Sequence, residues 1–454
     1  MWGVSSSEEP VSAWIEQRRD ALAALLAEMI RFDTTCIEPA FEPGRRNAEA
    51  DCQDFLRERL TRIGADVTSI EPDPADFAGH PMMPAGHHWD GRPMTLARIR
   101  GTGGGRDLVL NGHLDVVSAE PRGDWSVPPF AGEVVGERLV GRGASDMKGG
   151  VAAGLFALEA LHANGVRLAG DVWVQLVTDE ETNGMGTVAM LEHQPPADGA
   201  IVPEPSHFDA YVACRGVLYG QIAIEGRPAH AEQPQPHWRE GGAVGAIERL
   251  GPVLDAIREL NARWQDGAAG AHPLLAPPCV VPTLVEGGEF IASFPRACTL
   301  TFDATYLPAD ADADGHGTRA RARLREAIDA AVAHDDWLAE HPLRWSWTTD
   351  YPPYELAGAG AAPLLAALDA AGEQVGRPVG RAGLNAWHDA ASLGRLAGIP
   401  AVSCGPGRIE QAHTIDESIS LRDLTDGAAF LASAIRRFCG EAPITTEEDL
   451  HAPH

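Results

Sequence analysis

Residues 171–181 read DVWVQLVTDEE, a nearly unbroken apolar run that ends in three consecutive acidic residues. Continuous hydrophobic sequence of this length indicates a strand buried on both faces, as in a parallel sheet. Helices cover both faces of such a sheet, so strands and helices should alternate along the chain. The three carboxylates would then lie at the carboxyl end of the strand, where open α/β sheets form their ligand sites.

The rest of the chain alternates between strands and helices, as this strand requires. Apolar residues three and four apart predict helices over residues 14–31, 47–63, 148–162, 362–373 and 423–438. Short apolar runs predict strands over residues 107–111, 200–203 and 399–404. Residues 72–94 are rich in proline, glycine, methionine and histidine, and predict a long loop that is either close to a functional site or surface filler. We therefore predict an α/β fold with a mainly parallel central sheet.

The pattern changes between residues 218 and 352. Strands are predicted over residues 219–225, 279–286, 299–306 and 343–349, and helices over residues 241–263 and within 309–342. Two helices against a four-stranded antiparallel sheet would form a smaller α+β insert. The expected organisation is a first domain in two parts, residues 1–217 and 353–454, interrupted by a second domain over residues 218–352.

Composition excludes several classes of partner. The 454 residues carry a formal net charge of −29, which would repel nucleic acid and anionic membranes. No run of eighteen apolar residues occurs, so no membrane span is expected. The seven cysteines are isolated from one another and residues 1–16 lack the pattern of a secretory signal. These features predict free thiols and a cytoplasmic location.

Seven histidine and carboxylate side chains lie after predicted strands or in the turn that opens a helix: His113, Asp115, Asp146, Glu180, Glu181, Glu204 and His413. Singly, each has an ordinary explanation, such as a helix cap for Asp146 or a solvated acidic turn for residues 179–181. Together they would meet at the carboxyl edge of the sheet, and their side chains suit a divalent metal such as Zn²⁺. Two metals need a shared anionic bridge, which one carboxylate can supply.

Other enzyme chemistries lack their usual sequence support. The chain has no G-x-S-x-G, H-E-x-x-H, P-loop or complete G-x-G-x-x-G motif. Lys148 is the only lysine among 36 basic residues, which suggests that this position needs a compact ammonium group; survival of one lysine by chance is the alternative.

The motifs around these residues resemble those of a known family. They are NGHLD at 111–115, GRGASDMKGG at 141–150, DEE at 179–181, EP at 204–205, GRPAHA at 226–231 and the late His413. In this order, across residues 15–438, they resemble the co-catalytic zinc hydrolases that include acetylornithine deacetylase, succinyl-diaminopimelate desuccinylase, aminoacylase and glutamate carboxypeptidase. The resemblance implies a zinc-peptidase-like catalytic domain interrupted by a smaller lid domain, through which the chain forms a homodimer.

The resemblance also implies a ligand set for two Zn²⁺ ions, with Co²⁺ or Mn²⁺ as substitutes. Asp146 would bridge the two metals. His113 and Glu204 would complete one site, and Glu181 and His413 the other. The peptide bond between Asp146 and Met147 is expected to be cis.

The remaining family roles concern the reaction itself. Asp115 would orient His113, and Glu180 would act as the general base and acid toward a water activated by the metals. His230, on the lid, would donate to the developing oxyanion, in its own or a partner subunit.

The lid departs from the family pattern at two positions. Ala292 stands where the family has asparagine, and Thr305 stands where it has arginine. Recognition of an α-amino acid carboxylate is therefore doubtful, with Arg215 and Arg296 as possible substitutes. His388 is either an extra pocket residue or a packed histidine.

We therefore predict a deacylase that removes an acetyl, succinyl, formyl or similar group from a small N-acylated amino compound. A metallocarboxypeptidase or dipeptidase of the same family is the alternative. A non-catalytic binding protein is a further alternative, although the complete ligand set and Glu180 argue against it.

Overall fold

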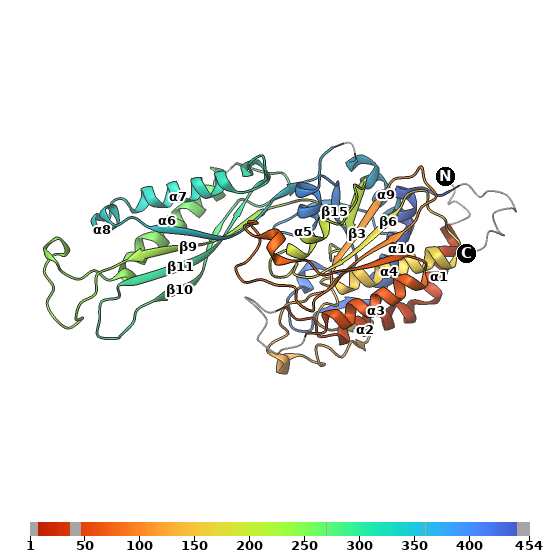
Figure 1. Ribbon diagram of the computed structural model, residues 1–454, viewed down its shortest axis with the longest axis horizontal. Coiled ribbons are helices and arrows are strands. Elements are labelled where there is room, and N and C mark those ends of the chain that lie inside the picture. The colour runs from red at the N-terminus through yellow and green to blue at the C-terminus, as the bar shows by residue number, and fades with distance from the viewer. Residues whose placement is uncertain (1–7, 37–46, 269, 359, 443–454) are drawn as a thin grey trace.

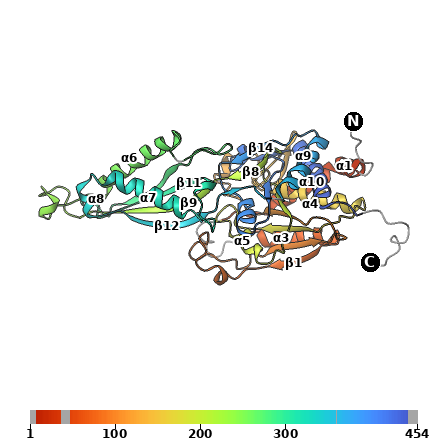
Figure 2. The same cartoon turned by 90° about the horizontal axis from the view of Figure 1, so that it is seen from above.

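The computed structural model describes residues 8–36, 47–268, 270–358 and 360–442. The molecule is elongated, with a larger body that contains both ends of the described chain and a smaller body formed by its middle (Figure 1). A view from above shows the same two bodies end to end (Figure 2). Among the described residues, no helix combines the length and apolar character needed to cross a membrane.

The central sheet of the larger body confirms the predicted α/β fold. Its middle consists of β6 (Val172–Val177), β3 (Leu108–His113), β7 (Gly199–Val202) and β15 (Ala401–Ser403), which are adjacent and parallel. Residues in β3 and β7 are buried throughout, and β6 is buried except for partial exposure of Trp173. Double-sided burial explains why these strands read as unbroken apolar runs.

Five further strands extend this sheet to nine strands in the part of the chain that is described. They are β1 (Asp66–Ile70), β2 (Met94–Ile99), β8 (Ala210–Cys214), β13 (Tyr354–Glu355) and β14 (Arg381–Leu384). Strands β1, β2, β8 and β13 pair with antiparallel neighbours, while β14 runs parallel to β8. A separate small sheet joins β16 (Ser418–Ser420), β5 (Arg138–Val140) and β4 (Glu133–Val135). That sheet brings the chain around residue 417 next to the turn that begins at residue 141.

Helices pack around the central sheet. They are α1 (Glu8–Gln17), α2 (Arg19–Arg31), α3 (Glu49–Arg62), α4 (Lys148–Ala163), α5 (Met185–Leu191), α9 (Ala361–Val375) and α10 (Leu421–Cys439). Helix α4 is almost wholly buried, because it packs against α10, α2 and β3. The prediction of one helix over residues 14–31 is wrong. The chain leaves helical geometry at Arg18, which lets α1 bury Val11 and Ile15 and lets α2 bury a separate apolar face.

The smaller body confirms the predicted antiparallel sheet with two helices. Its four strands in the described residues are β10 (Val280–Gly287), β11 (Ala297–Tyr306), β9 (Gly216–Glu225) and β12 (Arg344–Tyr351), in that spatial order. Helices α6 (Ala246–Gln265) and α7 (Thr318–Val332) pack on one face and share a core with β9 and β11. A short helix, α8 (Asp336–Glu340), follows α7 because Asp335 caps a new helix by accepting N–H bonds from Trp337 and Leu338. The chain passes between the two bodies where β9 begins and where β12 ends.

Residues 72–94 form most of the long connection between β1 and β2, in which a few side chains are buried and most are partly or fully exposed. A short 3₁₀ turn, Pro74–Phe77, is followed by Met82 and Trp89, both fully buried. These side chains share a core with Val177 of β6 and Met185 of α5. The segment therefore packs on the carboxyl end of β6.

Candidate metal centre

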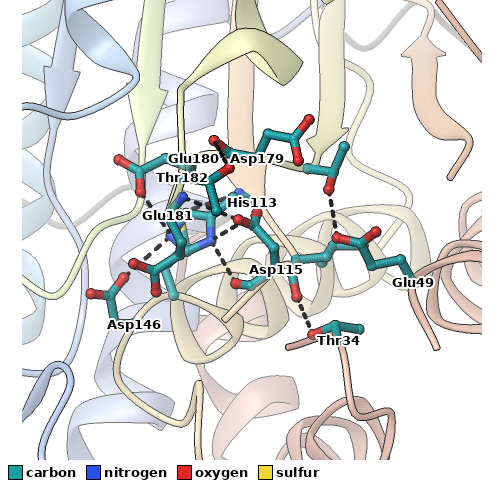
Figure 3. A network of polar contacts seen from close by, with 12 residues as sticks. Thr34, Glu49, His113, Asp115, Asp146, Asp179, Glu180, Glu181 and Thr182 are labelled. Atoms are coloured by element: carbon teal, nitrogen blue, oxygen red, sulfur yellow. Dashed lines mark hydrogen bonds and ion pairs between the residues drawn. The ribbon is translucent and has the colours of Figure 1, made fainter. Parts of the chain in front are cut away.

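The fold brings the predicted ligands to one place. His113 is the last residue of β3, Glu180 and Glu181 follow β6, and Glu204 follows β7. His413 lies in the connection between β15 and β16, and Asp146 lies in the turn that precedes α4. Figure 3 shows His113, Asp146, Glu180 and Glu181 converging at the carboxyl edge of the sheet.

Two groups of side chains in the described residues could each hold a metal ion. One group consists of His113, Asp146 and Glu204, and the other of Asp146, Glu181 and His413. Within each group, one ligand atom per residue lies within 4.8 Å of the others. Asp146 belongs to both groups, so a single carboxylate lies between two potential metal positions.

The orientation of Asp146 suits a bridge. Its Oδ1 lies 3.3 Å from Nε2 of His113, and its Oδ2 lies 3.6 Å from Nε2 of His413. Each oxygen of one carboxylate therefore faces one of the two histidines. The peptide bond from Asp146 to Met147 is cis, as expected.

His113 is held in one tautomer by its own strand end. Its Nδ1 lies 2.9 Å from the backbone carbonyl of Asp115 and can only donate to that oxygen. In the neutral ring Nε2 then carries the lone pair, and Nε2 is the atom that faces Asp146. The Oδ1 atom of Asp115 is farther away, 3.6 Å from Nδ1, so the main chain provides the closer contact. The Oδ2 atom of Asp115 accepts the backbone N–H of Glu181 at 3.1 Å.

His413 is placed differently from His113. Its side chain is 54 % exposed, and its backbone φ is 61°. Its Nε2 lies 2.9 Å from Oε2 of Glu181. Contact with Glu181 raises the pKa of His413. One potential metal position is therefore deeply enclosed, and the other is open to solvent through His413.

Negative charge is concentrated at this site. Burial raises the pKa of Glu180 and of Glu204 well above their ordinary value, and the nearby Asp146 adds to the effect on Glu204. Burial and the charge of Asp146 also raise the pKa of Glu181 to about 7, although His413 opposes the shift. Burial alone would raise the pKa of Asp146, but the two histidines hold it below its usual value. Crowded, buried carboxylates favour the binding of cations between them.

The donor set fits two divalent cations. The two imidazoles and three carboxylates of these groups are nitrogen and oxygen donors of the kind that Zn²⁺ and similar metals prefer. Three carboxylate charges nearly balance the four positive charges of two such ions. Glu180 belongs to neither group, but its Oε2 lies 3.9 Å from Nε2 of His113 and its side chain is 12 % exposed. Glu180 is therefore a carboxylate that lies beside the potential metal positions without belonging to either ligand group.

Glu417 is an important residue of the site that the sequence analysis did not assign. Its Oε1 accepts N–H bonds from Ser145 at 2.8 Å and from Asp146 at 3.0 Å. Its Oε2 accepts from Gly143 at 3.1 Å and from Nη1 of Arg142 at 2.7 Å. The buried carboxylate thus holds the whole turn that presents Asp146. The only signal in the sequence was its place four residues after His413.

Lys148 is fully buried, which fits a requirement for lysine at this position. Its Nζ donates to the backbone carbonyls of Met29 and Phe32 at 3.0 Å each. These carbonyls belong to the carboxyl end of α2, where positive charge is favoured. The ammonium group therefore anchors the start of α4, two residues after Asp146, to a neighbouring helix.

Four other residues singled out in the sequence lie away from this cluster or are engaged elsewhere. His230 follows β9 in the smaller body, and its Nδ1 accepts the N–H of Glu232. Arg215 donates to the carbonyls of Asn385 and Pro277, and Arg296 pairs with Glu289. Thr305 accepts the N–H of Cys279 at 3.0 Å.

His388 has the environment of a packed histidine. Its side chain is buried, and its Nδ1 contacts Oγ of Ser403. Burial lowers the pKa of His388 to about 3, so the ring is neutral. Burial also raises the pKa of the adjacent Asp389 carboxyl to about 7.

The sequence is similar to those of characterised hydrolases. It is 27 % identical to an N-formyl-4-amino-5-aminomethyl-2-methylpyrimidine deformylase of Halalkalibacterium halodurans over 95 % of this chain and 97 % of the relative. A protein of the same name from Bacillus subtilis is 26 % identical over 94 % of this chain and 96 % of the relative. A succinyl-diaminopimelate desuccinylase of Variovorax paradoxus is 32 % identical over 50 % of this chain and 56 % of the relative.

The fold is shared with solved structures. Human carnosine dipeptidase 1 matches with a TM-score of 0.72 at 16 % identity, over 96 % of this chain and 100 % of the other. A dinuclear metal-binding peptidase of the M20 family from Bacillus subtilis matches with a TM-score of 0.60 at 16 % identity, over 92 % of this chain and 98 % of the other. The model of peptidase family M20/M25/M40 matches residues 109–437, a span that includes all five potential metal ligands. This match confirms the family resemblance of the motifs, and the chain therefore belongs to peptidase family M20/M25/M40.

Proposed function

We propose that this protein is a metal-dependent amide hydrolase that removes a formyl or similar small acyl group from an N-acylated amine. The observation that carries the proposal is the position of Asp146 between two sets of ligands, with Glu180 beside them. Relatives that match nearly the whole chain are deformylases, which supports amide hydrolysis over a binding role.

If these residues hold two divalent cations, the site would gain Lewis-acid chemistry that polarises the amide carbonyl and lowers the pKa of the attacking water. Asp146 would hold the two cations together, with His113 and Glu204 on one and Glu181 and His413 on the other. Glu180 would accept a proton from the attacking water. As the C–N bond breaks, Glu180 would return that proton to the leaving nitrogen. Burial raises the pKa of Glu180 in the metal-free site. A group that both takes and gives a proton works best when its pKa lies near the operating pH.

The engagement of Thr305, Arg215 and Arg296 supports a substrate without a carboxylate. Thr305 replaces the family arginine and is bonded to Cys279, while Arg215 and Arg296 are bonded to other groups. A free guanidinium is the usual partner for a carboxylate. The aminopyrimidine in the name of the deformylase relatives has no carboxylate, whereas dipeptides and succinylated amino acids carry carboxylates. We therefore favour an N-formyl derivative of a heteroaromatic methylamine.

A substrate panel tests this function. The purified protein would be loaded with Zn²⁺ and given N-formyl-4-amino-5-aminomethyl-2-methylpyrimidine, N-formylbenzylamine, an N-succinyl amino acid and a dipeptide. Release of formate from the pyrimidine should have the highest kcat/KM. Preferred cleavage of the dipeptide would instead support a peptidase, and absence of turnover with metals bound would support a binding protein.

The Glu180→Gln variant tests whether Glu180 is the general base. It keeps the shape of the side chain but has no carboxylate to accept a proton. We expect kcat to fall by about 10²–10⁴, the usual contribution of a general base, with the metal content unchanged. Wild-type turnover in this variant would rule out Glu180 as the base.

We propose Zn²⁺ as the native metal, with Co²⁺ and Mn²⁺ as substitutes, because the donors combine imidazole with carboxylate. Elemental analysis of protein purified without added metal would test the identity of the metal. A content near two zinc ions per chain is expected.

All seven cysteines lie in described parts of the chain and are free thiols, which supports a cytoplasmic location.

We also propose that residues 218–352 form a lid and dimerisation domain between the two parts of a catalytic domain, residues 1–217 and 353–454. Strand β10 lies at the edge of its sheet and exposes several apolar side chains, among them Leu284 and Val285. An exposed apolar edge strand is a template for pairing with another chain. In such a dimer His230 would be available to stabilise the oxyanion in the partner's site.

A further inference from the structure

The turn that carries Glu180 and Glu181 begins at a residue in an unusual conformation. Asp179 has a backbone φ of 69°, in the left-handed region that most side chains avoid. Its carbonyl accepts the backbone N–H groups of Asn183 at 2.9 Å and Gly184 at 2.6 Å, with Thr182 at 3.3 Å. This geometry reverses the chain after β6, immediately before Glu180.

The side chain of Asp179 is anchored by the segment of residues 72–94. Its Oδ2 accepts the indole N–H of Trp89 at 2.8 Å, and Nε2 of His87 lies 2.9 Å from the same oxygen. Its Oδ1 accepts from Nη2 of Arg92 at 2.6 Å. Asp179 is 1 % exposed and Trp89 is fully buried, so these contacts are shielded from water.

Arg92 connects this anchor to a second element. Its guanidinium also pairs with Glu49 of α3 and donates to the hydroxyl of Thr178, the residue before Asp179. Thr178 in turn donates to Glu49. The start of the turn is therefore fixed from α3 and from the 72–94 segment at once.

The 72–94 segment is itself held in place. The backbone carbonyl of Pro81 accepts the N–H of Asp350, near the end of β12. Phe77 packs edge-on against Trp89, with ring centroids 5.8 Å apart. Met82 lies against Gly184, at the far end of the catalytic turn. An anchored segment of this kind can fix a turn, whereas a mobile surface loop cannot.

We propose that Trp89 and Arg92 are positioning residues that aim Glu180 at the metal centre through the carboxylate of Asp179. Neither residue touches the substrate or the metals in this scheme. The inference rests on the proposed role of Glu180 as general base and adds the groups that place it. Loss of these contacts should reduce the rate of the chemical step and leave substrate binding unchanged.

Two substitutions of Asp179 distinguish whether its side chain anchors the turn or whether only its backbone conformation matters. Asp179→Asn keeps an oxygen that accepts from Trp89 and tolerates a positive φ. Asp179→Gly relieves the backbone but removes the anchor. The proposal requires the asparagine variant to retain the higher kcat. Equal or higher kcat in the glycine variant would overturn it.

Trp89→Phe tests the indole donor, with Trp337→Phe as its matched control. Trp337 is also buried and donates its indole N–H, to the carbonyl of Glu225 in the smaller body. In the metal-loaded full-length protein, Trp89→Phe should lower kcat about tenfold with KM and metal content unchanged, a loss typical of an outer-shell partner. Trp337→Phe should leave kcat at the wild-type value.

Amide hydrogen exchange provides a readout that does not depend on activity. The amides of Asn183 and Gly184, which bond to the carbonyl of Asp179, should exchange faster in Trp89→Phe than in the wild type and in Trp337→Phe. Wild-type exchange in this turn would overturn the inference even if kcat fell. If the wild-type protein hydrolyses no N-acyl substrate, the proposed function fails, and the exchange measurement still decides whether Trp89 fixes the turn.

Discussion

Asp146 is the residue on which the proposed metal centre depends most. Its two carboxylate oxygens face two different histidines, and it belongs to both potential ligand groups. Asp146→Asn keeps the size of the side chain and removes its charge. Both cations should then bind more weakly, by more than the about 10–100-fold typical of losing an outer-shell partner. Isothermal titration with Zn²⁺ measures this loss.

A surface substitution controls for the change in net charge. Asp20 on α2 has a fully exposed side chain, so Asp20→Asn alters the total charge equally without touching the site. Its zinc affinity should match the wild type. If Asp146→Asn still bound two ions with wild-type affinity, Asp146 would not be the bridge.

We expect the buried side chain of His388 to make the folding stability of the protein depend on pH in acid. Burial lowers its folded pKa to about 3, whereas an unfolded histidine titrates near its ordinary value of 6.5. The unfolded state therefore binds one more proton between these pH values. The stability that neutral His388 contributes is complete above about pH 6.5 and is lost as the pH falls toward 3, by up to about 1.4 kcal/mol per pH unit.

Comparison with His388→Asn isolates this effect. The difference in unfolding free energy between wild type and variant should shrink as the pH falls from 7 to 4, as followed by urea denaturation. Loss of metals in acid, and titration of the adjacent Asp389, affect both proteins and largely cancel. A difference that stays constant over this range would show that His388 is not held neutral by the fold.

The residues of the site could be predicted from the sequence more fully than the contacts that they make. The metal-ligand candidates share a recognisable chemistry and follow strands, so their convergence could be predicted from the pattern. Glu417 could not be assigned, because its role is to accept the backbone N–H groups of Gly143, Ser145 and Asp146, and such bonds depend on the folded path of the main chain. For the same reason the backbone carbonyl of Asp115, rather than its carboxylate, is the closer partner of His113.

Among the elements, α4 has the most specific attachment. Lys148, its first residue, donates to two carbonyls at the end of α2 from a fully buried position. Lys148→Met would leave these carbonyls unpaired, which costs about 1–3 kcal/mol of stability. Lys148→Arg should also destabilise, because a planar guanidinium needs more room than the enclosed ammonium. Thermal and urea denaturation measure both effects.

An arginine that is mostly exposed supplies the comparison. The side chain of Arg62 in α3 is 64 % exposed, so Arg62→Met should change stability little. If Lys148→Arg were as stable as the wild type, the unique lysine would reflect chance. Burial lowers the pKa of Lys148 below its ordinary value of 10.5, so the unfolded state binds more protons than the folded state in alkaline solution, and the penalty for Lys148→Met should grow as the pH rises toward 10.5.

The helices and strands that could be predicted from the sequence are those that are buried on all sides or that bury side chains at a regular spacing. Strand β6 and helix α4 are enclosed on all sides, so nearly every position is apolar and the element is visible in the sequence. Short strands such as β8, β13 and β14 were not predicted. Each has only two to five residues, and it exists because a neighbouring strand offers hydrogen bonds. The break at Arg18 was missed for a related reason, since both flanking segments are good helices and only packing separates them.

One contact between the two bodies lies at the turn that carries Glu180 and Glu181. Tyr351, at the end of β12, donates its hydroxyl proton to the carbonyl of Thr182 at 2.8 Å. Asp350 beside it is fully buried and accepts from Tyr306 and from the backbone of Gly317. The last strand of the smaller body therefore contacts the turn that carries Glu180. Any change in the angle between the bodies would act on this turn.

The exposed apolar edge of the smaller body, at β10, indicates the oligomeric state that we expect. Leu284 and Val285 on β10 are 63 % and 54 % exposed, and Ile291 in the adjoining loop is 96 % exposed. A charge on this edge should prevent two chains from pairing. We expect the wild type to be a dimer and Leu284→Asp to be a monomer in light scattering coupled to size exclusion.

Val134→Asp is the matched control for this prediction, because Val134 is also about half exposed but lies on β4 of the larger body. It should remain a dimer. The net charge of −29 makes each chain repel the other, and salt screens that repulsion. An apolar interface on such a chain should therefore tighten as salt is added, whereas an interface held by ion pairs would weaken. A monomeric wild type at high salt would show that β10 does not pair, and His230 would then have no partner site to reach.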